Sequence, residues 1–95
     1  MIIDSEKIIE KKLVTLCKEN KGMCIKLLSN HMLGLPDRLC LFKGAKLVFV
    51  ELKTTNQKPR KIQLFMHKQL KNLGFRVEVI DTVEGVKKLV NEYEV

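Results

Sequence analysis

Apolar residues recur every three or four positions in three segments of the chain, a spacing typical of helices that bury one face. These segments cover residues 5–20, 59–73 and 82–92. Asp4 or Ser5 can cap the first helix, Pro59 suits the first turn of the second, and Gly74 follows its end. In the second helix we expect a core-facing apolar stripe formed by Ile62, Phe65, Met66, Leu70 and Leu73.

Four other segments read as strands, at residues 23–29, 38–42, 46–53 and 75–80. Only Lys43-Gly44-Ala45 separates the second strand from the third, which is short enough for a hairpin turn. The fourth strand follows a helix, so we expect it to lie parallel to a neighbour through a right-handed crossover. The order αβββαβα predicts one α/β domain over residues 1–95, with a mixed four-stranded sheet flanked by helices.

The charge balance suggests an anionic partner. The chain contains eighteen Lys and Arg and eleven Asp and Glu, which gives a net charge of +7. Nucleic acid is the simplest partner for such a charge, although small proteins are also basic for solubility. With four Phe, one Tyr and no Trp, a base-stacking platform is not evident, and contacts to phosphates are the more natural use of the lysines.

The longest apolar run, residues 47–50, is far shorter than the roughly 20 residues that span a bilayer. The N-terminus lacks the layout of a signal peptide. We therefore expect a soluble, intracellular protein with no membrane partner. Cys17, Cys24 and Cys40 are odd in number and form no C-x-x-C pair. Their apolar neighbours predict buried free thiols rather than a disulfide framework or a zinc site.

The third strand carries the candidate chemistry. Because side chains alternate along a strand, Glu51 and Lys53 share one face with apolar residues. Asp37 opens the preceding strand, and pairing through the turn at Gly44 places it opposite Glu51. Two converging carboxylates suit Mg²⁺ or Mn²⁺. A cross-strand salt bridge of these carboxylates with Lys53 or Arg38 explains the same residues equally well at this point.

The residues around this pair carry a resemblance. Pro36-Asp37, then thirteen residues, then Glu51-Leu52-Lys53 resembles the signature of PD-(D/E)xK nucleases. The wider context is similar to the VRR-Nuc family of that superfamily, which has a restriction-endonuclease-like core. The matching segments are Gly34-Leu35-Pro36-Asp37-Arg38, Phe49-Val50-Glu51-Leu52-Lys53-Thr54, Gln63 and Gly74-Phe75-Arg76-Val77.

The resemblance implies a role for each matching residue. Asp37 and Glu51 would bind Mg²⁺ or Mn²⁺ together with the backbone carbonyl of Leu52. Lys53 would be the catalytic lysine, and Gln63 would be a further catalytic residue beside the active site.

Other positions extend the predicted site. Glu10 on the first helix matches the family's helical glutamate, an additional metal or water contact, and Glu6 competes for that role. We do not expect His31 or His67 to be catalytic, because the two lack metal-ligand spacing. The family's valine-arginine-arginine element does not occur in this sequence. Predicted DNA contacts are Lys26, Arg38, Lys58, Arg60 and Lys61.

Stand-alone members of this family resemble small viral and bacterial proteins. The resemblance implies a metal-dependent endonuclease selective for branched DNA, including four-way (Holliday) junctions, in the cytoplasm of a bacterium or of a virus-infected cell. A four-way junction has two-fold symmetry, which favours a homodimer with one site in each chain. Two alternatives remain, a DNA-binding module of the same fold without catalysis and a basic RNA-binding domain.

Overall fold

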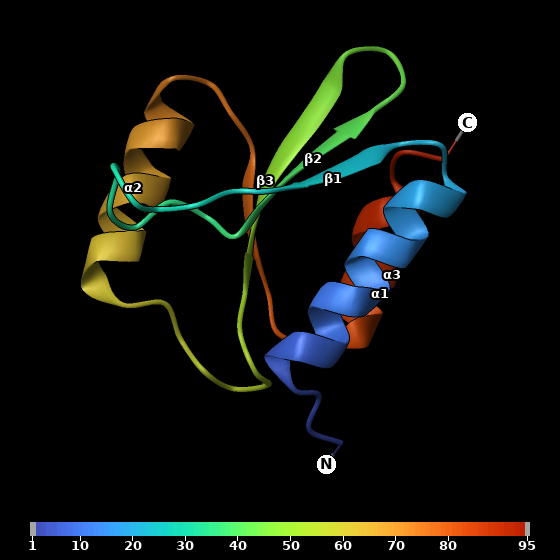
Figure 1. Cartoon of the computed structure of the whole chain (residues 1–95), viewed down its shortest axis with the longest axis horizontal. Helices are drawn as coiled ribbons and strands as arrows, with labels where there is room; N and C mark the ends of the chain where they lie inside the picture. The colour runs from blue at the N-terminus through green and yellow to red at the C-terminus, as the bar shows by residue number, and fades with distance from the viewer. Residues whose placement is uncertain (1, 95) are drawn as a thin grey trace.

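The sheet at the centre of the fold has the strand order β1-β2-β3-β4 (Figure 1). The computed structural model describes residues 2–94. The first three strands form an antiparallel meander, and β4 lies parallel to β3. Their bounds are β1 Met23–Lys26, β2 Arg38–Phe42, β3 Lys46–Leu52 and β4 Val77–Ile80.

Helices cover both faces of the sheet. The helices α1 (Glu6–Glu19) and α3 (Val83–Asn91) lie side by side on one face, and α2 (Lys61–Asn72) lies on the other (Figure 1). The Ser5 hydroxyl accepts a hydrogen bond from the backbone N–H of Ile8 and so caps α1. Thr82 caps α3 in the same way through the N–H of Gly85. The sequence thus specifies where both helices of this layer begin.

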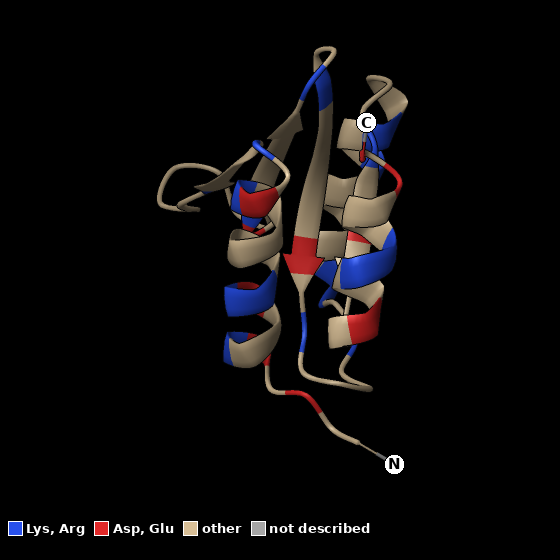
Figure 2. Ribbon diagram, turned by 90° about the vertical axis from the view of Figure 1, so that its right-hand side faces the viewer, with Lys and Arg blue, Asp and Glu red and all other residues tan. Residues whose placement is uncertain are grey.

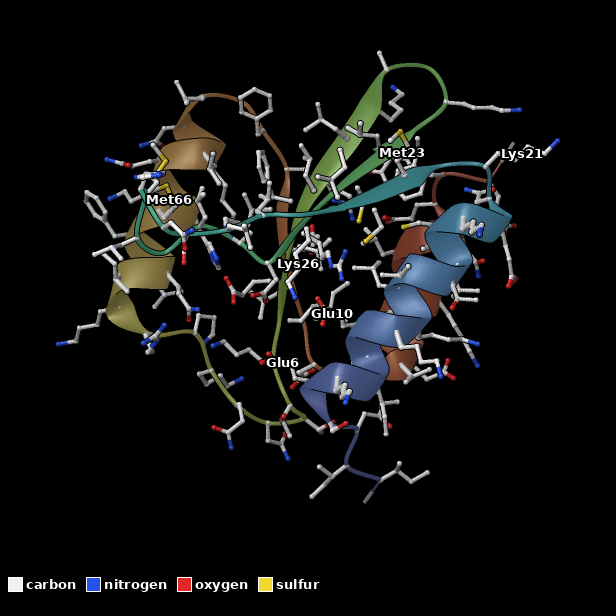
Figure 3. All side chains as sticks on the ribbon, in the orientation of Figure 1. Glu6, Glu10, Lys21, Met23, Lys26 and Met66 are labelled. Atoms are coloured by element: carbon white, nitrogen blue, oxygen red, sulfur yellow. The ribbon has the colours of Figure 1, made fainter. Side chains whose placement is uncertain are left out.

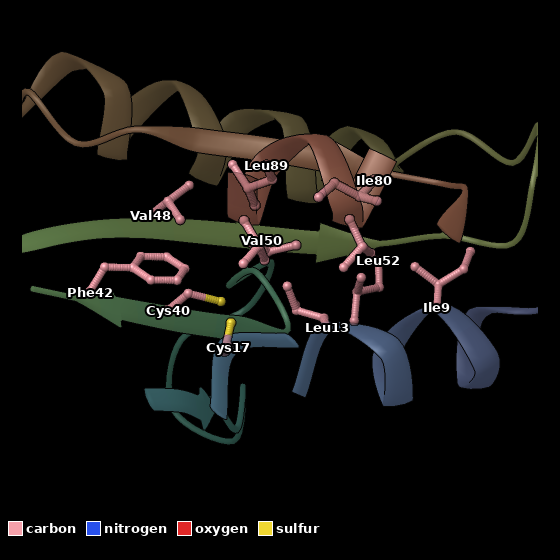
Figure 4. Packing of buried hydrophobic residues seen from close by; sticks show 12 residues of the cluster. Ile9, Leu13, Cys17, Cys40, Phe42, Val48, Val50, Leu52, Ile80 and Leu89 are labelled. Atoms are coloured by element: carbon pink, nitrogen blue, oxygen red, sulfur yellow. The ribbon is translucent and has the colours of Figure 1, made fainter. Parts of the chain in front are cut away.

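The hydrophobic core fills the space between the sheet and the α1–α3 layer (Figure 4). Val48, Val50 and Leu52 point from alternate positions of β3 into this layer and are fully or almost fully buried. Burying a side chain of this size stabilises the fold by about 1.5–3 kcal/mol. The same alternation turns Glu51 toward α2 on the opposite face. The strand therefore carries packing on one face and the candidate chemistry on the other.

The predicted fold class and element order are confirmed. The hairpin register is also as expected, because Arg38 pairs with Val50 and this continues to Asp37 opposite Glu51. Some boundaries are wrong. The first strand ends at Lys26 instead of Ser29, and α2 begins at Lys61, beyond Pro59.

The predicted apolar stripe of α2 is wrong for three of its five residues. Ile62 is 43% exposed, Phe65 57% and Leu73 73%, and only Met66 and Leu70 are half-buried, whereas Gln63 and His67 are buried. The physical reason is the position of α2, whose inner face meets the carboxylate end of β3. A polar environment there selects polar side chains. In residues 2–94 no helix combines the length and apolar character that crossing a membrane requires.

Candidate active site

Two carboxylates meet where β3 ends. The Asp37 Oδ2 atom accepts a hydrogen bond from the backbone N–H of Leu52 at 2.7 Å. This bond holds the carboxylate against the third strand, beside Glu51. Figure 2 shows an acidic band at the end of β3 and a basic stretch in the segment that follows. The hairpin thus brings the Asp-Glu-x-Lys residues of the sequence motif into one place.

Glu51 is a buried carboxylate with a fixed orientation. Its side chain is 1% exposed. The amide nitrogen of Gln63 donates to Glu51 Oε2 at 3.1 Å, and Nε2 of His67 lies 3.2 Å from Glu51 Oε1. The Gln63 carbonyl in turn accepts from the backbone N–H of Arg60 at 2.8 Å. Gln63 therefore connects the first turn of α2 directly to the candidate metal ligand.

The electrostatics of Glu51 favour a bound cation. Burial, with the charge and hydrogen bonding of the adjacent Asp37 carboxylate, raises the pKa of Glu51 from 4.5 to about 8, although Lys53 acts in the opposite direction. Two carboxylates this close repel each other when both are ionised. A divalent cation between them would remove that repulsion, and hard oxygen donors are the ligands that Mg²⁺ and Mn²⁺ take. The donor set of Asp37 and Glu51 fits such an ion.

His67 lies beside Glu51, a position that no metal-ligand spacing in the sequence had indicated. Its side chain is buried, and burial, with the positive charge of Lys71, lowers its pKa. A neutral imidazole beside Glu51 adds no positive charge and restricts the carboxylate by hydrogen bonding. The available signal was helical spacing, since His67 follows Gln63 by four residues and so lies on the same face of α2.

The structure separates the two helical glutamates that competed for one role. The Glu10 carboxylate forms an ion pair with Arg38 at 2.9 Å. The pKa of Glu6 is raised by partial burial and by the charges of Asp37 and Glu10, while Lys53 lowers it. Both glutamates point from α1 toward the strands (Figure 3). Glu10 is thus already partnered by a cation, and Glu6 is coupled electrostatically to the motif residues.

Arg38 has an internal position that differs from its predicted role as a DNA contact. Its side chain is only 15% exposed. Besides the ion pair with Glu10, its Nη1 donates to the backbone carbonyl of Cys24 at 3.3 Å. Arg38 therefore holds α1 and β1 against β2. The other predicted DNA contacts all have exposed side chains: Lys26, Lys58, Arg60 and Lys61.

The turn before Asp37 is fitted closely to α2. Gly34 has a φ of +82°, and a Cβ atom built on it would lie 2.5 Å from the backbone oxygen of Ile62. The adjacent Pro36 is fully buried. This contact fixes the start of α2, and hence Gln63, relative to the strand that Asp37 precedes. The Gly-x-Pro-Asp pattern therefore suits a turn that needs a positive φ at Gly34 and close contact with α2 before Asp37.

A hydrogen-bonded cluster after β3 positions the start of α1. The backbone N–H of Glu6 donates to the Thr54 hydroxyl at 3.1 Å, and that of Asp4 donates to the Thr55 hydroxyl at 2.9 Å. The Thr55 hydroxyl also donates to the carbonyl of Asp81 at 2.7 Å. These bonds bring the first turn of α1 to the segment that follows Lys53.

The fold and this arrangement define a nuclease domain of the PD-(D/E)xK class. Comparisons with known proteins specify the family. A curated protein named "Putative nuclease p44", from Acyrthosiphon pisum secondary endosymbiont phage 1, is 39% identical over 74 residues, which cover 78% of this chain and 80% of that protein. A solved structure described as a VRR_NUC domain matches with a TM-score of 0.84 and 27% identity, covering 95% of this chain and 99% of that one. The chain belongs to the VRR-Nuc family, although no family model matches it.

Proposed function

We propose that this protein is a divalent-metal-dependent endonuclease that hydrolyses branched DNA, with four-way junctions as the preferred substrate. The main support is the Glu51 carboxylate. It is buried, oriented by Gln63 and His67, and set beside Asp37. Burying an ionised carboxylate is costly unless a cation accompanies it, and groups with such strongly shifted pKa values cluster at functional sites.

Asp37, Glu51 and the backbone carbonyl of Leu52 would hold Mg²⁺ or Mn²⁺. When bound, the ion polarises the phosphodiester and makes a water a better nucleophile. Lys53 lies on the Glu51 face of the strand, where its ammonium would orient that water or stabilise negative charge developing on the phosphate. Gln63 and His67 keep the Glu51 carboxylate in place while this happens. Glu6 or Glu10 would supply a further contact from α1.

A cleavage assay with two variants tests the assignment. Asp37→Asn and Lys53→Met should each lower the single-turnover cleavage rate in Mn²⁺ by about a thousandfold, the scale of losing a group that stabilises transition-state charge. Both should bind junction DNA within a few-fold of the parent. The matched control is Lys46→Met, which removes an exposed lysine at the opposite end of β3. Undiminished cleavage by Asp37→Asn would refute the site.

Substrate preference needs a separate experiment. Labelled junction, flap, splayed and duplex DNAs should be incubated with the protein in Mg²⁺, in Mn²⁺ and in EDTA. We expect cleavage only with metal, and fastest on the junction. Binding without cleavage under every condition would support the non-catalytic DNA-binding module, and preference for structured RNA would support the RNA-binding domain.

The two-fold symmetry of a junction leads us to propose a homodimer, since one chain supplies one site. Exposed apolar residues on and near α2 support this proposal. Leu64 and Phe65 are more than half exposed on the outer face of α2, and the loop before β2 adds exposed Met32 and Leu33. We call these four residues the α2 patch. Exposed apolar clusters of this kind mark interaction sites. Light scattering of the junction complex should give two chains per DNA, and one chain per DNA would contradict the dimer.

A further inference from the structure

Three cysteines from three different elements meet in the core. Cys17 lies in the last turns of α1, Cys24 in β1 and Cys40 in β2. Their Sγ atoms all lie within 4.8 Å of one another, and the Cys24 and Cys40 sulfurs are 3.9 Å apart. Figure 4 shows the sulfurs of Cys17 and Cys40 directed toward each other. The separation of the three residues in sequence explains why no metal-binding spacing was visible.

The spacing of the sulfurs is that of a thiolate metal site. With a Zn–S bond of about 2.3 Å, sulfurs in a tetrahedral or trigonal zinc site lie ~3.8–4.0 Å apart. The Cys24–Cys40 separation already has this value, and the third sulfur needs to move by less than ~1 Å. Cys24 and Cys40 sit directly opposite in the β1–β2 ladder, so the strands hold two of the three ligands in register.

The net charge of a three-thiolate site and the partial exposure of Cys24 are compatible with a bound divalent ion. Three thiolates around a divalent ion carry a net charge of −1. Arg38, which is paired with Glu10, also donates to the backbone carbonyl of Cys24 and so lies near the cluster. Cys17 and Cys40 are fully buried, whereas Cys24 is partly exposed. A fourth ligand such as water would have to enter from the Cys24 side.

We propose that Cys17, Cys24 and Cys40 form a second metal site that binds Zn²⁺ through three thiolates. The ion would join α1 to β1 and β2. Glu10 lies on α1 and Arg38 on β2. Zinc would therefore fix the helix that carries the glutamates relative to the β2–β3 hairpin beside Asp37. The site is structural and is separate from the carboxylates, because thiolates select soft cations and carboxylates select hard ones.

Cadmium absorption can test this site without interference from the carboxylates. The reduced, chelator-treated full chain carrying Asp37→Asn is titrated with Cd²⁺, and thiolate-to-cadmium charge transfer is recorded in the ultraviolet. We expect the band to saturate near one equivalent, to weaken only under a large molar excess of Zn²⁺ because the softer Cd²⁺ binds thiolates more tightly, and to be accompanied by a higher melting temperature. Absence of the band would overturn the proposal.

Two substitutions of Cys24, the partly exposed ligand, distinguish a loss of metal binding from a loss of folding. Cys24→Ser and Cys24→Ala, in the same background, should lower the Cd²⁺ affinity by more than about 100-fold, the upper end for losing only a supporting contact. Their metal-free melting temperatures should stay close to that of the parent. An unchanged band in both variants would refute the three-thiolate site. A Cys24–Cys40 disulfide in protein isolated without oxidant, detected as two thiols protected from alkylation, would refute it as well.

Discussion

At the scale of single residues, Gln63 links the scaffold to the chemistry. Its carbonyl oxygen accepts from the backbone of Arg60 at 2.8 Å, and its amide nitrogen donates to Glu51 at 3.1 Å. An amide is suited to this position because one side chain both accepts and donates. The orientation of Glu51 is therefore tied to the start of a helix.

Gln63→Ala should lower junction cleavage by about 10- to 100-fold, the usual effect of removing a residue that orients a metal ligand. The loss of its buried hydrogen bonds should also reduce the free energy of unfolding by about 1–3 kcal/mol. Single-turnover rates and urea denaturation measure the two effects. Gln69→Ala, at an exposed position of α2, is the control and should change neither. A stable Gln63→Ala protein that cleaves normally would show that Glu51 needs no such support.

Glu51 also makes metal-free stability depend on pH. Its pKa is raised to about 8 in the fold from an ordinary value of 4.5, so the folded chain retains a proton that the unfolded chain releases. The stabilisation is complete below pH 4.5 and is lost as the pH rises through 8. In EDTA, we expect the free energy of unfolding to fall by about 1 kcal/mol between pH 7 and pH 8.

Urea denaturation at the two pH values measures this fall. Mg²⁺ should reduce it, because the cation replaces the proton as the partner of the ionised carboxylate. Asp37→Asn should reduce it without metal, because the repelling charge is gone. If the parent and Asp37→Asn lose stability equally, the pH dependence has another origin.

At the scale of elements, the turn containing Gly34 determines how α2 meets the sheet. Gly34→Ala would place a methyl group 2.5 Å from the Ile62 carbonyl oxygen and would also strain a backbone with φ of +82°. Gly44 has nearly the same φ, +80°, but a methyl group at that position would have no neighbouring atom within 4 Å among the described residues. The two glycines differ in the close contact and share the backbone conformation.

Gly34→Ala should therefore destabilise the fold by more than Gly44→Ala, for which only the left-handed backbone cost of about 1–2 kcal/mol applies. We also expect a drop in cleavage for Gly34→Ala alone, because Gln63 moves with the start of α2. Thermal unfolding and cleavage rates of the pair give the comparison. Equal losses in the two variants would mean that the contact with α2 relaxes without consequence.

The helices and strands could be predicted from the sequence because the signals that define them lie within a few neighbouring residues. Hydrophobic period and capping residues specify the order of helices and strands, and a short turn fixes the register that brings Asp37 opposite Glu51. The environment of α2 was not predictable in this way. Its apolar residues suggested a core face, but its docking on the carboxylate end of β3 buries Gln63 and His67 instead. The cysteine cluster was hidden for the same reason, since three elements contribute to it. The catalytic roles themselves remain predictions.

At the scale of the whole molecule, α2 has two faces with different uses. The inner face carries Gln63 and His67 to the candidate site, and the outer face carries Leu64 and Phe65 of the α2 patch. A dimer formed through this patch would place the two active sites on either side of a shared helical layer.

Phe65→Glu should shift the protein toward monomer, because a charge replaces exposed apolar surface in the α2 patch. We expect paired cuts in a junction to become independent single nicks, while cleavage per active site falls by less than about tenfold. Analytical ultracentrifugation and a supercoiled cruciform substrate separate these effects. Met23→Glu, which alters a comparably exposed apolar residue on β1, is the control. If the mass of Phe65→Glu is unchanged, the α2 patch is not the dimer interface.

The hydrogen bond between Asp4 and Val83, 2.8 Å long, also has a consequence for the order of folding. It joins positions 79 residues apart, whereas the β2–β3 hairpin joins positions separated by a short turn. Closing a long loop costs more chain entropy, so the hairpin should pair early and α1 and α3 should dock late. The contacts of α2 with Glu51 span 12 and 16 residues, also more than the hairpin turn, so Asp37 and Glu51 would meet in water before α2 covers them. A refolding chain could acquire its divalent ion at that stage, while the carboxylates are still hydrated and readily ionised.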